Sequence, residues 1–315
     1  MQPHISTDPT AGCNSVERLL DIVELRMIES LSLNTSRATR ITRDSISAVD
    51  AAAYHLTAGG QRVRAKLALH AGLALGLTIS DSITIATAVE LLHNASLVHD
   101  DIQDHDELRR GQKSVWVHFG VSTAICTGDL MLSAAYAAVC KIQSTHALAA
   151  MILLLHERTA VAIDGQCADL MANADVVDDA VLAVTRYEKI AAAKSGALLC
   201  LPLELALLAC RQDRYLPDAR RAVEAFAIGY QIVDDLNDLH SDAGADAASS
   251  TFNIVSICKH FGGFEASVHE AKKLGRQHLD MAIESATSLP SGSGALLIDY
   301  ANRLRTLLVE QNKRV

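Results

Sequence analysis

The sequence predicts an all-α protein, and three observations support that prediction. Only five of the 315 residues are proline, and none lies between Thr10 and Leu201. Since a proline inside a helix costs roughly 3 kcal/mol, its absence permits long helices. Apolar residues make up 50% of the chain. They recur at helical spacing, whereas the alternation typical of strands is never sustained.

We expect a single domain over residues 13–315, preceded by a disordered tail over residues 1–12. The tail is polar and contains two of the five prolines. The length alone suggests about two domains. However, the sequence contains no internal repeat and no linker long enough to separate two domains, so one large helical domain is the better prediction.

The helices are predicted in order along this domain. The first is marked by apolar residues that share one helical face. These residues are Val16, Leu19, Leu20, Val23 and Met27. A second apolar segment ends near Gly76, and the next helix starts at a capping residue, Asp81 or Ser82, and runs to an acidic cluster. Further helices are predicted at about 121–142, 146–173, 178–193, 195–211, 217–240, 251–287 and 293–312.

Charge and cysteine content narrow the class of function. The 28 basic and 37 acidic residues give a net charge of −9, which argues against binding to nucleic acid or to an anionic membrane. None of the seven cysteines forms a CxxC pair, so reduced thiols in a cytoplasmic protein are expected. The sequence shows neither an export signal nor a run of about 18 apolar residues, so no transmembrane segment is predicted.

Two acidic clusters carry the strongest chemical signal. Each has the pattern D-D-x-x-D after an apolar, helix-length segment. The members are Asp100, Asp101 and Asp104 in the first cluster, and Asp234, Asp235 and Asp238 in the second. Residues i and i+4 share one helical face, so the outer carboxylates of each cluster converge and repel one another unless a cation binds. Oxygen ligands without cysteine favour Mg²⁺.

A single cluster of this kind is equally compatible with a solvated helix end. Two copies favour a functional interpretation, because a solvated charge run does not need an apolar segment before it. Helices from distant parts of one bundle can then present two metal-binding rims to one cavity.

Basic residues accompany the first cluster. Arg109 and Arg110 follow it, and Arg62 and Arg64 belong to a glycine-led turn that begins at Gly59. One guanidinium group can donate two parallel hydrogen bonds to the oxygens of a phosphate, and glycine lets the backbone approach a phosphate closely. His93 lies two helical turns before Asp100 on the same face, although a lone histidine is more often an ordinary core or surface residue.

These residues resemble the all-trans isoprenyl diphosphate synthases, the family that includes farnesyl, geranylgeranyl and longer-chain polyprenyl diphosphate synthases. The resemblance covers at least residues 59–238, with the motifs in the expected order. They are GGQRVR, HNASLVHDDIQDHDELRRG, GD at 128–129, GQCADL at 165–170, KSG at 194–196 and GYQIVDDLND. The resemblance implies a single antiparallel helical bundle around a deep central cavity, and a homodimer.

The resemblance also implies a reaction and its residues. Mg²⁺, about three ions per active site with substrate bound, would be held by Asp100, Asp104 and Asp234, with the other cluster aspartates in support. Isopentenyl diphosphate would be bound by the segment Gln61, Arg62 and Arg64 with His93 and Arg110. The allylic diphosphate would be bound by Arg109, Lys194, Ser195 and Gln231, with Lys194 and Gln231 near the developing carbocation.

Three departures from the family pattern affect this expectation. Gln61 stands where members usually have lysine, and Ala65 stands where they usually have proline. Losing that lysine removes a charge-assisted phosphate contact of about 1.5–3 kcal/mol, so weaker binding of isopentenyl diphosphate is expected. The segment after Asp238, HSDAGADAASSTF, contains no lysine, whereas family members often carry lysines there.

Small residues precede the first cluster and bear on product length. Ala95 and Ser96 stand where short-chain enzymes often have an aromatic stop, which predicts an open cavity and geranylgeranyl diphosphate or a longer product. Met131 and Tyr136 are candidates for a deeper floor, although ordinary core packing is the simpler interpretation of both.

Two alternatives stay open. A class I terpene cyclase shares the helical fold and the first cluster, but typically has an Asn/Ser/Glu-type second metal motif. A non-catalytic regulatory subunit is favoured by Gln61 and the lysine-free segment. Six intact aspartates with Arg109, Arg110 and Lys194 argue against it, because charges of this kind are costly to assemble for structure alone.

Overall fold

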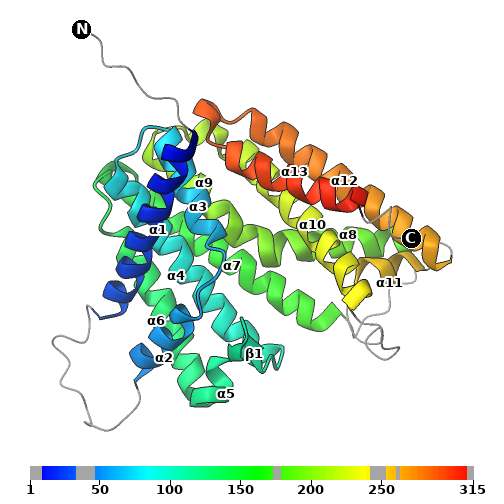
Figure 1. Ribbon diagram of the computed structural model, residues 1–315, viewed down its shortest axis with the longest axis horizontal. Coiled ribbons are helices and arrows are strands. Elements are labelled where there is room, and N and C mark those ends of the chain that lie inside the picture. Colours follow the sequence, from blue (N-terminus) through cyan, green and yellow to red (C-terminus); the bar gives the residue numbers. More distant parts are fainter. Residues whose placement is uncertain (1–8, 33–46, 173–178, 242–252, 260–262, 311–315) are drawn as a thin grey trace. The chain divides into compact units, whose positions relative to one another are not determined.

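The computed structural model describes residues 9–32, 47–172, 179–241, 253–259 and 263–310. Within these segments every regular element is helical except two strands of two residues each, so the all-α prediction is confirmed (Figure 1). The chain divides into two compact units, residues 1–152 and 153–315. The single domain over residues 13–315 stays a prediction, and each unit is described here by itself.

Unit 1 is built around one long helix, α4 (Ile79–Gln103), which packs against α1 (Pro9–Ser32), α3 (Val63–Ala74) and α6 (Val121–Val139). The remaining elements are α2 (Ala48–Thr57), the strands β1 (Leu108–Arg109) and β2 (Gln112–Lys113), α5 (Val115–Phe119) and the 3₁₀ turn η1 (Thr145–Ala147). The side chains of α4 are almost all buried between residues 81 and 95, so α4 is the core helix of this unit.

Unit 2 contains most of α7 (Leu148–Ala172) and a bundle around α10 (Leu216–Ser241), which packs against α9 (Ala197–Ala209), α12 (Phe264–Thr287) and α13 (Ala295–Glu310). The other elements are α8 (Ala180–Ala191), the π-helix η2 (Ala192–Gly196), the 3₁₀ turns η3 (Asp213–Tyr215) and η6 (Pro290–Gly292), and α11 (Ile254–Cys258). Figure 1 shows α10, α12 and α13 side by side in yellow to red.

Several predicted boundaries were wrong. Helix α1 begins at Pro9, so residues 9–12 are helical rather than part of a disordered tail, whereas residues 1–8 lie outside the described segments. Proline is well suited to this first helical position because it has no N–H to leave unbonded. The predicted helix over 251–287 is α11 and α12, and residues 260–262 between them are also outside the described segments.

The start of α4 also differs from the prediction. Thr78, not Asp81 or Ser82, is the N-cap, and its side chain accepts a hydrogen bond from the backbone N–H of Asp81. The Asp81 carboxylate instead accepts hydrogen bonds from the backbone N–H groups of Gln143 at 2.7 Å and Ser144 at 3.2 Å. A long-range contact therefore displaced the local capping role of this aspartate.

Two helical stretches of the described chain have the length and hydropathy of a membrane span, Thr145–Ala172 and Val181–Ala209. The most apolar window of the second stretch is 78% buried, as expected for the core helix of a folded unit, and that of the first is 28% buried. Length and composition alone do not establish a span in either case.

Candidate active site

The first acidic cluster lies at the C-terminal end of α4. Asp104 is the C-cap residue, and its backbone N–H donates to the carbonyl oxygen of Asp100 at 2.8 Å. Asp104 is exposed and Asp100 is partly exposed, whereas Asp101 between them is completely buried. This difference follows from the helix, because Asp101 points about 100° away from the face that Asp100 and Asp104 share.

The buried Asp101 binds Arg109. The guanidinium donates from Nε to the Asp101 carboxylate at 2.7 Å and from Nη2 to the same oxygen, and Nη2 also donates to Asp106 at 2.9 Å. Burial raises the pKa of Asp101, while the Arg109 guanidinium opposes that shift. The second aspartate of the cluster therefore holds an arginine in place, and its supporting role at a metal stays a prediction.

A β-hairpin presents Arg109 and Arg110. Strands β1 and β2 pair in antiparallel fashion, with Leu108 opposite Lys113. Arg110 (φ 56°) and Gly111 (φ 80°) form the two-residue turn, and positive φ at both positions is typical of a type I′ hairpin. Arg110 also donates to the carbonyl oxygen of Gly59. A Cβ atom on Gly60 would lie 2.7 Å from Cζ of Arg110, so only glycine permits this approach.

The residues of the basic turn before α3 differ in exposure and in their contacts. Gln61 is exposed and Arg64 is partly buried. Arg62 is only 6% exposed; its Nε donates to Glu24 at 2.9 Å and its Nη2 donates to the Leu56 carbonyl at 3.1 Å. Arg62 therefore lies in the interior of unit 1, and its contact with the substrate stays a prediction.

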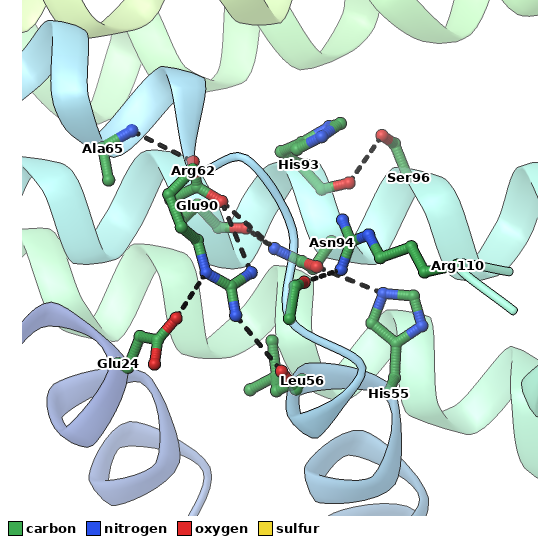
Figure 2. Close-up of polar contacts among 11 residues, drawn as sticks. Glu24, His55, Leu56, Arg62, Ala65, Glu90, His93, Asn94, Ser96 and Arg110 are labelled. Atoms are coloured by element: carbon green, nitrogen blue, oxygen red, sulfur yellow. Dashed lines mark hydrogen bonds and ion pairs between the residues drawn. The ribbon is translucent and has the colours of Figure 1, made fainter. Parts of the chain in front are cut away.

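Two histidines, His55 and His93, lie near Arg62 and Arg110 (Figure 2). Burial, together with the charges of Arg64 and Arg110, holds the pKa of His93 well below its usual value. Burial and Arg110 likewise lower the pKa of His55 to about 4, although its hydrogen bond to Asn94 opposes the shift. Neutral imidazoles beside several guanidinium groups make a site that favours an anion. The binding of isopentenyl diphosphate by Arg64, His93 and Arg110 stays a prediction.

The two predicted chain-length residues are placed differently. Ala95 is 1% exposed and packs in the core of unit 1, whereas Ser96 lies on the partly exposed side of α4 together with His93 and Asp100. The Ser96 hydroxyl donates to the carbonyl oxygen of His93 at 2.8 Å. Met131 is fully buried, which agrees with core packing, and Tyr136 is partly exposed.

The second acidic cluster lies on α10 in unit 2 and repeats the arrangement of the first. Asp234 and Asp238 are exposed, whereas Asp235 is 7% exposed. Partial loss of hydration, and then the charge of Asp238, raise the pKa of Asp234. Two like charges one turn apart are thus already unfavourable, and a cation between them would relieve the repulsion.

Asp235 accepts three hydrogen bonds from within unit 2. The donors are the Tyr187 hydroxyl at 2.8 Å, the backbone N–H of Ile254 at 2.9 Å and the Gln231 amide at 3.0 Å. Burial raises the pKa of Asp235, and these donors oppose that shift. Asp235 thus ties α10 to α8 and α11 and orients Gln231. Its supporting role at a metal stays a prediction.

Lys194 and Ser195 lie in the π-helix η2, a type of helix that often occurs at functional sites. The Lys194 ammonium donates to Asp169 of α7 at 2.5 Å. Gly165 of α7 permits this arrangement, because a Cβ there would lie 2.4 Å from the backbone nitrogen of Lys194. The Lys194 and Asp169 side chains are both partly buried, so their ion pair is held within unit 2 while part of each side chain stays accessible.

The acidic residues fit Mg²⁺ only in part. In the described segments no group of three or more His, Cys, Asp or Glu side chains is arranged to hold a metal ion. Each cluster instead offers two exposed or partly exposed carboxylates. Mg²⁺ usually binds one or two carboxylates and completes its shell with waters and substrate phosphates. The donor set therefore fits a Mg²⁺ ion that shares its ligands with a diphosphate.

Two residues that contact predicted site residues, and one buried polar side chain, were not predicted. Asp169 binds Lys194, and Tyr187 binds Asp235. Gln166 is 8% exposed, and neither of its amide atoms has a hydrogen-bond partner among the described residues. The motif GQCADL was a signal for Gln166 and Asp169, whereas no local pattern indicated Tyr187. The lysine-free segment after Asp238 lies largely outside the described chain, from residue 242 to 252.

Comparison with known proteins agrees with these features. A (2E,6E)-farnesyl diphosphate synthase of Mycobacterium tuberculosis (strain ATCC 25618 / H37Rv) is 36% identical over 133 residues, which are 41% of this chain and 35% of that protein. The match thus spans about a third of that relative's length. A geranylgeranyl diphosphate synthase of Pseudescherichia vulneris is 29% identical over 199 residues, 60% of each protein.

The fold is also that of a solved structure. A geranylgeranyl pyrophosphate synthetase from the archaeon Geoglobus acetivorans superimposes with a TM-score of 0.75 at 24% identity, covering 92% of this chain and 99% of that chain. This likeness confirms the predicted fold. The polyprenyl synthetase family model matches residues 47–249, well over half of the sequence. Together with the two aspartate clusters, this match shows that the chain belongs to the polyprenyl synthetase family.

Proposed function

We propose that this chain is a Mg²⁺-dependent trans-prenyltransferase that condenses isopentenyl diphosphate with an allylic diphosphate and releases diphosphate. The observation that carries the proposal is the shared design of the two aspartate clusters. In each, the outer carboxylates are exposed or partly exposed, while the second carboxylate is buried and bonded within its own unit. This arrangement suits ions that bind one or two carboxylates and a substrate phosphate.

In this proposal Asp100, Asp104 and Asp234 hold the ions, about three per active site. Mg²⁺ held by these carboxylates would neutralise the charge that develops on the departing diphosphate. Arg64, His93 and Arg110 bind isopentenyl diphosphate, with Gln61 at the exposed rim. Burial, and then the charges of Arg64 and Arg110, lower the pKa of His93, and the same positive charges support an anion there.

Four other residues bind the allylic substrate: Arg109, Lys194, Ser195 and Gln231. Breakage of its C–O bond leaves the electron pair on the diphosphate. The double bond of isopentenyl diphosphate then supplies the electrons of the new C–C bond. The resulting cation loses a proton, which the released diphosphate takes up, and a new allylic double bond forms. Lys194 and Gln231, held by Asp169 and Asp235, lie beside the developing cation in this assignment.

We further propose geranylgeranyl diphosphate or a longer chain as the product. Ser96 is small and lies on the partly exposed side of α4, one helical turn before Asp100. No large side chain occupies this position to stop a growing chain. Sizing the products formed from farnesyl and isopentenyl diphosphates tests this length; farnesyl diphosphate that is formed but never extended is the contrary result.

A homodimer in the cytoplasm completes the proposal. Helix α7 exposes large apolar side chains, among them Leu153 at 56%, Ile163 at 55% and Met171 at 66%. Exposed apolar side chains on one helix favour a protein partner. The six cysteines whose side chains the structure describes form no disulfide, which suits a reducing compartment. Light scattering of the purified protein measures the dimer directly.

Diphosphate release tests the reaction against its two rivals. A prenyltransferase requires Mg²⁺ and both substrates, a terpene cyclase requires only the allylic substrate, and a regulatory subunit releases no diphosphate with either. One specific feature favours a regulatory subunit, namely the exposed Gln61 in place of a lysine. Release that depends on both substrates supports the proposal, and either other pattern rejects it.

A further inference from the structure

Glu90 on α4 is a buried carboxylate to which the sequence analysis gave no role. It is 2% exposed, and its carboxylate lies beside the start of α3, as Figure 2 shows. Its Oε1 accepts a hydrogen bond from the backbone N–H of Ala65 at 3.0 Å, and its Oε2 lies 4.0 Å from Nη1 of Arg62. Burying a carboxylate is costly unless polar groups contact it, and these two contacts supply such groups at the start of α3.

The start of α3 has no local cap. Its N-cap residue is Arg62, which has a left-handed backbone (φ 51°) and makes no side-chain capping hydrogen bond. A cation at this position also opposes the helix dipole, whose positive end lies at the N-terminus. Glu90 supplies both missing contributions from another helix, because it accepts from a backbone N–H of the first turn and places a negative charge there.

The first turn of α3 and the segment before it carry the proposed isopentenyl diphosphate site. Arg64 is the second residue of α3, and Gln61 directly precedes its N-cap. The carbonyl oxygen of Gly59 binds Arg110. His93 lies on α4 less than one turn beyond Glu90. A shift of the α3 start would therefore move Gln61 and Arg64 relative to His93.

A second set of contacts holds Glu90 itself. The Asn94 amide donates to the Glu90 carbonyl oxygen at 2.7 Å and to its carboxylate at 3.4 Å, and the Asn94 oxygen lies 3.1 Å from Nε2 of His55. Asn94 and His55 are both buried. The chain of contacts thus joins α2, α3 and α4 around one carboxylate (Figure 2).

We propose that Glu90 is a positioning residue for the isopentenyl diphosphate site, because its buried carboxylate fixes the start of α3 and thereby the placement of Gln61 and Arg64. This inference rests on the proposed function for the identity of the ligand. Glu90 acts through the backbone of α3 and through Arg62, and it does not touch the substrate.

The test compares Glu90→Ala with Glu90→Gln and with a matched control in unit 2. Glutamine keeps an oxygen that can accept from Ala65, whereas alanine removes it. Glu204 is the control, because it is also fully buried and binds two arginines, with Arg158 at 2.8 Å and Arg220 at 3.2 Å. Glu204→Ala removes a comparable buried carboxylate from the interior of unit 2.

The first measurement is the KM of each substrate. Glu90→Ala is expected to raise the KM for isopentenyl diphosphate about tenfold relative to that for the allylic diphosphate, since the first turn of α3 loses its capping acceptor. Glu90→Gln should restore most of the difference, and Glu204→Ala should leave the KM ratio unchanged. Equal increases in both KM values, or the same split in Glu204→Ala, would overturn the inference.

The second measurement needs no activity. Amide hydrogen exchange of a peptide covering residues 59–70 reports how firmly the start of α3 is held. Exchange there should rise at least tenfold in Glu90→Ala, rise less in Glu90→Gln and stay unchanged in Glu204→Ala. If Glu90→Ala does not fold, the increase in amide exchange of residues 59–70 in Glu90→Gln tests the role of Glu90 instead. Unchanged exchange rejects the role of Glu90 even in an active enzyme, whereas an inactive wild-type chain rejects only the proposed function.

Discussion

Within each aspartate cluster, neighbouring carboxylates differ in what they bind. Asp100 and Asp234 lie on the accessible side of their helices, whereas Asp101 and Asp235 are engaged by Arg109 and by three donors, respectively. A carboxylate needed for an external cation has to keep its oxygens available, and a carboxylate needed to hold a side chain must not. The pattern D-D-x-x-D therefore contains two roles.

Replacing the outer or the second aspartate should have opposite effects. Asp100→Ala and Asp234→Ala are expected to reduce turnover by orders of magnitude, because a metal ligand is lost, while stability without Mg²⁺ stays equal or rises as like-charge repulsion is relieved. Asp235→Asn should instead lower the free energy of unfolding by about 1–3 kcal/mol, since buried donors lose a charged acceptor. Urea unfolding and initial rates measure both. Unchanged turnover in either alanine variant would reject the metal assignment.

Gln61 offers a gain-of-function test. The side chain is exposed at the rim of the basic turn, so a lysine there meets no steric barrier. An ammonium group would add a charge-assisted phosphate contact of about 1.5–3 kcal/mol. Gln61→Lys should therefore lower the KM for isopentenyl diphosphate about tenfold or more and leave the allylic KM unchanged. Steady-state kinetics with each substrate varied in turn measure this, and no change would mean that other residues already replace the lysine.

His55 should make stability depend on pH. The folded protein protonates His55 only near pH 4, whereas the unfolded chain takes up that proton near 6.5. The contribution of neutral His55 is thus complete above pH 6.5 and is lost as the pH falls to 4, by about 3 kcal/mol in all. His55→Gln keeps a donor for Asn94 but cannot titrate, so its unfolding free energy should fall less between pH 7 and pH 4.5. The exposed His146, changed to glutamine, is the control. An equal pH dependence in His55→Gln and wild type would contradict this assignment.

Among the elements, the π-helix η2 depends most clearly on one residue of its neighbour. Gly165 lets α7 approach η2 so closely that an added Cβ would lie 2.4 Å from the Lys194 nitrogen and 2.7 Å from the Ala193 carbonyl carbon. Gly165→Ala should push the two backbones apart, lower stability by about 1–3 kcal/mol and reduce kcat, because Lys194 and Asp169 separate. Gly263→Ala, where an added Cβ meets nothing within 4 Å, is the matched control. Wild-type kcat in a folded Gly165→Ala variant would separate catalysis from this packing.

The sequence predicted elements better than their ends and their partners. Periodicity identified the helices around Val23, Ile85 and Ile232 because each has a continuous apolar face. It misplaced the start of α4, because Asp81 bonds residues more than sixty positions away. Proline was treated as a helix breaker, and Pro9 and Pro217 do lie at helix starts, but Pro202 lies buried inside α9. The contact between Tyr187 and Asp235 spans 48 residues, and no local pattern encodes it.

At the scale of the whole molecule, the two aspartate clusters belong to different compact units. The resemblance and the proposed reaction both require the two clusters to act on one diphosphate. Cooperation between the clusters is therefore the property of the whole chain that the proposal most needs.

Thermal unfolding with Mg²⁺ and inorganic pyrophosphate measures that cooperation. A ligand present at about 100 times its Kd stabilises the folded state by about 2.7 kcal/mol, which is a rise in Tm of several degrees. We expect this rise only when Mg²⁺ and pyrophosphate are both present. Asp100→Ala and Asp234→Ala should each abolish most of it, and the double variant should lose no more than either single one, because one ligand uses both clusters. If each single variant loses about half of the rise and the double variant loses all of it, the clusters bind separately. A single shared diphosphate site would then be excluded.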